Sequence, residues 1–152
     1  MTGSKFKIDL LLPVKESFSA ANAGAVATIV HDLVTESRYE DDIRVVGRAI
    51  DAPFDGVNFC GLKPKIAWLL GKNDGFTAAY LDRLKVPPRP DLIEVHGRCH
   101  VASQLIKKRP DIPVSLYLHN DPRTMKGAKT IGERESLLNR LVQIICVSDY
   151  IR

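Results

Sequence analysis

The chain has 152 residues, of which 45% are hydrophobic and 26% are charged, and its mean hydropathy is −0.08. These values fit one globular domain with a buried core and argue against a disordered chain. The formal net charge of +4 permits an anionic partner, such as a nucleotide, a phosphoglycan or a membrane surface, but does not require one.

The cysteines and the N-terminal sequence indicate the compartment. Cys60, Cys99 and Cys146 cannot all pair, and none forms a C-x-x-C motif, which is the cysteine usage of a reducing compartment. Residues 1–5 contain no apolar segment of signal length, and no apolar run approaches the ~20 residues of a membrane helix. We therefore expect a cytoplasmic protein.

The first element in the chain is an apolar run over residues 7–12, closed by Pro13, which predicts a central strand covered on both faces. A loop of small residues then leads through Ala23 and Gly24 into a helix over residues 25–34. Backbone amides at such a helix start can face an anion. However, no G-x-G-x-x-G motif is present, so a plain strand-to-helix turn explains this loop equally well.

The middle of the chain predicts two more strands, over residues 43–47 and 57–60, followed by helical segments over residues 63–70 and 75–84. Asn73 or Asp74 could cap the second helical segment. We expect Trp68 and Tyr80 to be packing residues rather than platforms for a ligand.

Two apolar runs that each stop at a histidine are the main functional lead. Residues 92–95 precede His96, residues 116–118 precede His119, and each run follows a turn containing Pro and Asp. Residues 101–108 between them are helical in character, which makes a strand-helix-strand unit. Because ligands bind beyond the carboxyl ends of parallel strands, we expect both histidines to line one concave region at that edge of the sheet.

The end of the chain continues the same alternation. Residues 120–130 form a polar loop, residues 131–141 a helix, and residues 142–147 a last apolar strand. Ser148 has the character of a helix N-cap, but almost no helix follows, so we expect this chain to be the front part of a longer protein. Strands that alternate with helices predict an α/β fold, a three-layer Rossmann-like domain with a mostly parallel sheet and helices on both faces.

Each candidate site residue also has a simpler interpretation. His96 could bond a ligand hydroxyl, or it could be satisfied by a neighbouring backbone carbonyl. Asn120 and Asp121 precede Pro122 and so suit a turn as well as a binding loop. The charges of Lys126, Lys129 and Arg134 fit an anionic ligand, but individually they are more typical of a solvated loop. No carboxylate–histidine motif completes a metal site, so we expect no metal.

These elements together resemble the N-terminal domain of a group 1, or family 4, glycosyltransferase of the GT-B fold. The resemblance covers essentially all of residues 1–152, and its motifs are the glycine-containing loop, PDLIEVHG at 90–97, HNDP at 119–122 and IICVS at 144–148. It implies retaining transfer of a sugar from a nucleotide-sugar donor to a glycan or lipid-linked acceptor, as in the synthesis of polysaccharide or lipopolysaccharide at the cell surface. It also implies that the C-terminal domain, which binds the nucleotide-sugar, is absent from this chain, so that this part alone is inactive.

The resemblance assigns roles to particular residues. Gly24, with Ala23 where the family usually has a second glycine, matches the loop that approaches the donor diphosphate. His96 matches the histidine that contacts the transferred sugar. His119, Asn120 and Asp121 match the loop on the acceptor side. The charges of Lys126, Lys129 and Arg134 would suit an acceptor that bears phosphate or carboxylate. No cofactor, metal or nucleic acid is implied, and peripheral contact with the inner face of a membrane is compatible with a lipid-linked acceptor.

Two other interpretations remain open. A nucleotide-sugar epimerase half has a related two-domain cleft and would differ most in the second domain. A free-standing α/β binding module, similar to a response regulator, is the alternative that is not an enzyme. Against this last alternative, Asp9 lies inside the first predicted strand rather than at its end, where a phosphoacceptor would stand.

Overall fold

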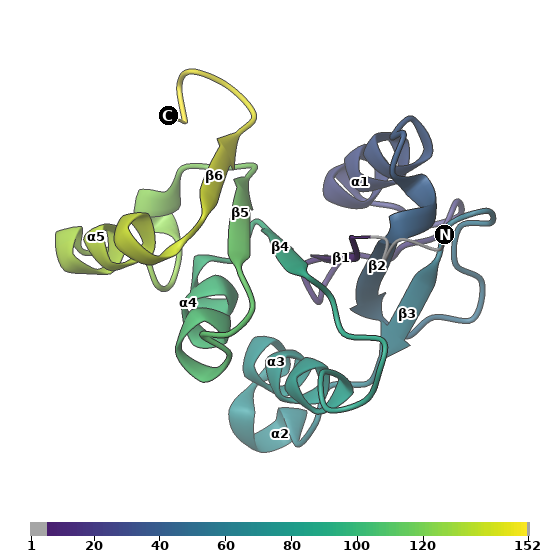
Figure 1. Ribbon diagram of the computed structural model, residues 1–152, viewed down its shortest axis with the longest axis horizontal. Coiled ribbons are helices and arrows are strands. Elements are labelled where there is room, and N and C mark those ends of the chain that lie inside the picture. The colour runs from purple at the N-terminus through teal and green to yellow at the C-terminus, as the bar shows by residue number, and fades with distance from the viewer. Residues whose placement is uncertain (1–5, 152) are drawn as a thin grey trace.

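A computed structural model describes residues 6–151 and shows six parallel strands in one sheet (Figure 1). In chain order these are β1 (Ile8–Leu11), β2 (Ile43–Arg48), β3 (Phe59–Leu62), β4 (Leu92–His96), β5 (Val114–Leu118) and β6 (Gln143–Cys146). Across the sheet the order is β3-β2-β1-β4-β5-β6, so the direction of winding reverses between β1 and β4. Ligands of doubly wound sheets bind beyond the carboxyl ends of the strands at such a switch point.

Helices lie on both faces of this sheet. The α-helices are α1 (Ala25–Thr35), α2 (Ala67–Leu70), α3 (Lys72–Arg83), α4 (Cys99–Lys108) and α5 (Ile131–Arg140), and the short 3-10 turns are η1 (Glu40–Asp42) and η2 (Pro122–Thr124). Helix α1 packs on one face, while α3, α4 and α5 pack on the other (Figure 1). The predicted three-layer Rossmann-like α/β fold is therefore confirmed.

The core has two parts because neighbouring side chains on a strand point to opposite faces. On β1, Leu10 packs with Val30 and Val34 of α1, whereas Leu11 packs with Phe76 of α3 and with the residues of α4. All of these side chains are buried. The near-continuous apolar sequence of β1 thus reflects a strand that is covered on both sides.

The face that α1 covers has a second half, formed by β4 and β5, with different chemistry. Parallel pairing puts Glu94 beside Ser115 and His96 beside Tyr117 on this half. Among residues 6–151, the helices on the sheet pack either on β1 and β2 or on the opposite face, so none of them covers this row of polar and aromatic side chains. The row ends at the carboxyl edge of the sheet, where the candidate site lies.

Some boundaries differ from the sequence-based expectations. In the region 63–70 only α2 is helical, and α3 starts at Lys72, earlier than predicted. Gly71, with φ of 83°, separates the two helices and is the N-cap residue of α3, so the expectation that Asn73 or Asp74 caps this helix is wrong. The Asp74 carboxylate instead accepts a hydrogen bond from His100 of α4 at 2.8 Å.

The two expected packing residues have opposite environments. Tyr80 is fully buried, as predicted, but the side chain of Trp68 is 86% exposed, so the expectation that it packs in the core is wrong. Helix α2 is a single turn that buries none of its residues, which is why an aromatic side chain on it stays in solvent. No helix within residues 6–151 has both the length and the apolar character needed to cross a bilayer.

Candidate functional site at the carboxyl edge of the sheet

The two histidines meet at the carboxyl edge, as their places after neighbouring strands predict. Nδ1 of His96 and Nε2 of His119 are 2.9 Å apart, a hydrogen-bond distance, and the two ring centroids are 5.1 Å apart. Tyr117 stacks on both rings, at 4.7 Å from His96 and 4.8 Å from His119. Three aromatic rings, His96 of β4, Tyr117 of β5 and His119 just after β5, thus form one cluster at the end of the polar row.

Glu94 extends this cluster into a chain of three ionisable groups. Its Oε1 lies 2.8 Å from Nε2 of His96. A carboxylate can only accept, so His96 donates to Glu94 through Nε2. When Nδ1 of His96 carries no proton, it accepts from Nε2–H of His119. This assignment follows from the hydrogen-bond network. It leaves Nδ1 of His119 as an acceptor for the hydroxyl of a ligand.

Burial separates the roles of the two histidines. His96 is 0% exposed, so the expectation that its ring lines an open concave region is wrong. Its neighbours on the cluster, Tyr117 and His119, are only partly buried. A ligand at this edge can therefore touch His119, whereas His96 can act only through the hydrogen bond that it makes with His119.

The environment of His119 keeps its imidazole neutral. Burial, and to a smaller extent the proximity of His96, lower the pKa of His119 to about 4, while the negative charge of Glu94 acts in the opposite direction. At neutral pH the ring can therefore accept a proton or a hydrogen bond at Nδ1 and carries no charge of its own. Such a group suits the orientation of a hydroxyl.

Glu94 and Tyr117 were not singled out from the sequence, although a signal for both was present. Glu94 is two residues before His96 and Tyr117 is two residues before His119. On a strand this spacing puts both members of a pair on the same face. The positions of Glu94 and Tyr117 within two otherwise apolar runs were therefore sufficient to predict the cluster.

The loop after β1 contains Ala23 and Gly24, which were expected to approach a diphosphate. Gly24 is the N-cap residue of α1 with extended φ and ψ of −79° and 177°. Oε2 of Glu16 accepts a hydrogen bond from the backbone N–H of Ala27 at 3.1 Å. A Cβ on Gly24 would stand 2.5 Å from this same oxygen. A carboxylate of the chain itself thus occupies the anion position at the start of α1, and a diphosphate there would have to displace Glu16.

The loop after β5 holds its own charged residues in place. Asp121 caps η2 by accepting from the backbone N–H of Arg123, and the Arg123 guanidinium also binds this carboxylate, with Nη2 at 2.7 Å. These contacts lower the pKa of Asp121. Nη1 of Arg134 donates to the backbone carbonyls of Ala128 and Lys129, both at 2.8 Å. Asp121 and Arg134 therefore shape the loop. For Asp121 this agrees with the turn interpretation of the sequence, whereas the role of Arg134 was not predicted.

The remaining acceptor-side candidates lie at the surface. Asn120, Lys126 and Lys129 are exposed. Lys126 lines a concave region of about 210 Å³ that also includes Gly97, Arg98 and His100 at the start of α4. Lys126 and Arg98 are thus brought together near the histidine cluster, since Gly97 directly follows His96 and lies against the ring of His119.

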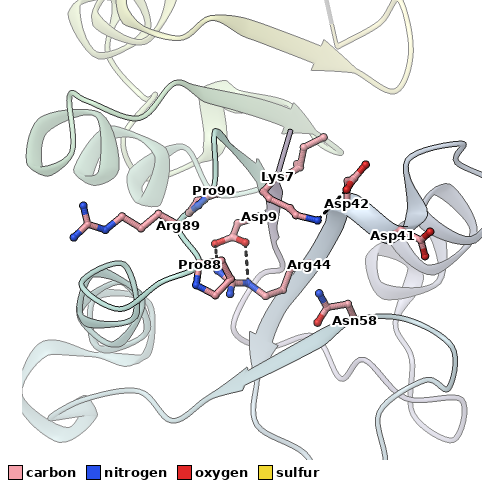
Figure 2. Close-up of a pocket in the computed structure, with 10 residues that line it drawn as sticks. Lys7, Asp9, Asp41, Asp42, Arg44, Asn58, Pro88, Arg89 and Pro90 are labelled. Atoms are coloured by element: carbon pink, nitrogen blue, oxygen red, sulfur yellow. Dashed lines mark hydrogen bonds and ion pairs between the residues drawn. The ribbon is translucent and has the colours of Figure 1, made fainter. Parts of the chain in front are cut away.

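A cavity of about 140 Å³ at the opposite, amino edge of the sheet also contains charged residues (Figure 2). There Arg44 binds Asp9 through two hydrogen bonds of 2.9 and 2.7 Å, and the Tyr80 hydroxyl donates to Asp9 at 2.7 Å. Nζ of Lys7 lies 2.9 Å from Asp42. These charges neutralise one another within the chain, so we regard this cavity as structural. Asp9 is indeed buried inside β1 and is not a phosphoacceptor at a strand end.

Within residues 6–151, no group of three or more His, Cys, Asp or Glu side chains is arranged to hold a metal ion. Comparison with known proteins adds no assignment, because the sequence matches no family model and no curated protein sequence. The class that the coordinates define is a Rossmann-like α/β domain with a histidine cluster at its switch-point edge. Its function has to be argued from that geometry.

Proposed function

We propose that this domain is the acceptor-side half of a retaining GT-B glycosyltransferase. The full enzyme would transfer a sugar from a nucleotide-sugar to a glycan or lipid-linked acceptor in the synthesis of a cell-surface polysaccharide or lipopolysaccharide. The observation that carries the proposal is the chain Glu94–His96–His119, with contacts of 2.8 and 2.9 Å, beside the topological switch point of a parallel sheet. Sugars present hydroxyl groups, which a fixed neutral imidazole recognises well.

In this proposal His119 contacts the sugar hydroxyl near the reacting centre. His96 is a positioning residue, because its buried ring holds His119 in one tautomer and orientation, and Glu94 fixes the tautomer of His96 in turn. This arrangement revises the role that the resemblance implies for His96. It assigns direct contact to the histidine of the next strand.

The two flanking regions would hold the rest of the substrates. The loop at Ala23 and Gly24 would face the donor diphosphate after the Glu16 carboxylate moves aside. Lys126, Lys129 and Asn120 would face the acceptor, and the concave region with Arg98 suits a phosphate or carboxylate on it. Asp121 and Arg134 would act indirectly by holding the loop that carries these residues.

The direct test is a histidine-selective NMR titration of the 152-residue chain with UDP-, GDP- and ADP-linked hexoses and with candidate glycan acceptors. We expect a sugar ligand to shift the His119 imidazole signals and to leave those of His31 on α1 unchanged. In a polypeptide that includes a second domain, we expect His119→Asn to lower sugar transfer about 10- to 100-fold, and His31→Asn to leave it unchanged.

The same experiments can reject the proposal. If the longer polypeptide converts a nucleotide-sugar to its epimer and transfers nothing, the epimerase interpretation replaces this one. If no sugar or nucleotide shifts any histidine and His119→Asn has no effect on transfer, the domain is a binding module and the histidine cluster is structural.

A further inference from the structure

Helix α2 and the residue before it present an exposed apolar surface, which we call the α2 patch. Its members are Ile66, Trp68, Leu69 and Leu70, whose side chains are 52%, 86%, 66% and 44% exposed. Single exposed apolar residues are common on protein surfaces, but four within five consecutive residues, including the only tryptophan of the chain, mark an interaction site.

The backbone holds this patch in place at both ends. Ile66 adopts a left-handed conformation with φ of 44°, which is costly for a β-branched residue. Its carbonyl accepts hydrogen bonds from the N–H groups of Leu69 and Leu70, and Lys65 N–H donates to the carbonyl of Gly75 at 2.9 Å. The chain therefore uses a strained turn to keep these large apolar side chains largely in solvent.

The charge around the patch has one sign. Residues 61–72 include Lys63, Lys65 and Lys72 and no acidic residue. All three lysines are exposed, and only Lys65 forms a described ion pair, with Asp82 of α3. An apolar surface with a basic border is complementary to a surface that is apolar inside and anionic at its rim.

We propose that the α2 patch docks the protein on an anionic membrane interface, with Trp68 at the level of the lipid headgroups. Trp is favoured at this level because its ring is amphipathic, and Ile66, Leu69 and Leu70 would enter the boundary of the acyl chains. Lys63 and Lys72 would contact anionic headgroups. Two copies of the chain joined through this patch would instead oppose lysines to lysines, so a symmetric dimer is the less favourable occupant.

The patch lies close to the edge that carries the histidine cluster. Helix α2 follows the carboxyl end of β3 and leads directly into α3, beside which it lies in Figure 1. Asp74 in the first turn of α3 is joined to His100 of α4 at 2.8 Å, and Lys126 stands 3.9 Å from the same carboxylate. Docking through α2 would bring this edge towards the bilayer surface. The proposal of membrane docking rests on the α2 patch itself and does not depend on the proposed transferase function.

Because Trp68 is the only tryptophan, its fluorescence reports contact with lipid directly. The experiment titrates the 152-residue chain with vesicles of phosphatidylcholine alone and of phosphatidylcholine with phosphatidylglycerol, at low and high salt. We expect a blue shift of the emission and co-sedimentation with the anionic vesicles, weakened by salt. We also expect quenching of the emission by brominated acyl chains.

Matched variants distinguish binding through the α2 patch from nonspecific binding to vesicles. Leu69→Ser should reduce binding to the anionic vesicles about tenfold, whereas Leu138→Ser on α5, whose side chain is also 66% exposed, should not. Replacing Lys63 and Lys72 by Gln should reduce binding roughly 25-fold at low salt, at about fivefold for each lysine. The same change at Lys107 and Lys108, which are exposed on α4, is the control.

Three results would overturn this proposal. The first is an unchanged emission spectrum with every vesicle. The second is equal loss of binding in the Leu69 and Leu138 variants. The third is a blue shift that grows with protein concentration in the absence of lipid, together with dimer in sedimentation velocity, which would show that a second copy covers the patch. Circular dichroism of each variant verifies that the fold is intact.

Discussion

His119 should make the stability of this domain depend on pH in a defined window. In the unfolded chain its pKa is about 6.5, the ordinary value for a histidine, while in the fold burial and the neighbouring His96 lower it to about 4. Between these values the unfolded chain binds a proton that the folded chain does not bind. The free energy of unfolding should therefore fall as the pH falls from 6.5 to 4, and be fully retained above 6.5.

The size of this effect follows from the shift. A difference of 6.5 minus about 4 is about 2.5 pKa units, and each unit corresponds to about 1.36 kcal/mol, which makes an upper limit of about 3.4 kcal/mol. Because His119 is only partly buried, solvent screening reduces the expected contribution to about 1–2 kcal/mol. Other groups with shifted pKa, such as Asp111 at about 2, titrate at lower pH and affect wild type and variant alike.

The perturbation is His119→Gln, which removes the titrating ring and keeps a polar side chain. Urea denaturation followed by far-UV circular dichroism, at several pH values between 4 and 7.5, measures the free energy of unfolding. Trp68 fluorescence is a poor probe of unfolding here, since this side chain is already 86% exposed in the fold. We expect the wild-type protein to lose about 1–2 kcal/mol more than the variant between pH 6.5 and 4.

The same measurement on His31→Gln is the control, because His31 lies on α1 and bonds its neighbour Asp32 rather than the cluster. A direct check is the NMR titration of the His119 ring, whose midpoint should lie near pH 4. A midpoint at 6.5 or above, or an identical pH dependence in wild type and His119→Gln, would refute the argued neutral state of His119. The assignment of Nδ1 as a free acceptor would fail with it.

Five further substitutions test other parts of the structure, each by urea denaturation. Asp9→Asn should cost about 3 kcal/mol, because it leaves the mostly buried guanidinium of Arg44 without its charge partner. Tyr80→Phe should cost about 2 kcal/mol, because the lost hydrogen bond is made to a carboxylate. Unchanged stability would mean that these contacts of Asp9 are unimportant. Gly127→Ala should cost about 2–4 kcal/mol, because φ of Gly127 is 89° and the added Cβ would stand 2.8 Å from the backbone of α4. The control is Gly56→Ala, which should cost only about 1 kcal/mol, because φ is 74° but no atom lies within 4 Å of the added Cβ. Thr130→Ala should cost about 1 kcal/mol through loss of the capping box of α5, and a change below ~0.3 kcal/mol would contradict that cap.

Much of the fold is determined by local sequence patterns. The apolar run closed by Pro13 specifies β1, and the runs that follow turns containing proline and aspartate specify β4 and β5, each to within a residue or two. A buried strand needs little more than apolar side chains and turn residues at its ends. Alternation with helical segments then requires parallel strands and right-handed crossovers. The helices in the region 63–75 were harder to predict, because a single helical turn has no periodicity to detect. The boundary between them falls at Gly71, whose φ is positive.

Some properties of the candidate site cannot be predicted from local sequence patterns. The sequence by itself determined that His96 and His119 end neighbouring strands, and therefore that they meet. Only the tertiary structure decided that His96 is buried and that His119 is only partly buried, because the exposure of each ring depends on its neighbours, and Tyr117 stacks on His96 at 4.7 Å. It also decided that Arg134 and Asp121 bind their own loop, that Glu16 occupies the start of α1, and that Trp68 faces solvent. The burial of His96 depends on residues distant in the chain, such as His119 and Tyr117. The bonds of Asp121 and Arg134 are local, but the sequence pattern does not show which partner each side chain takes.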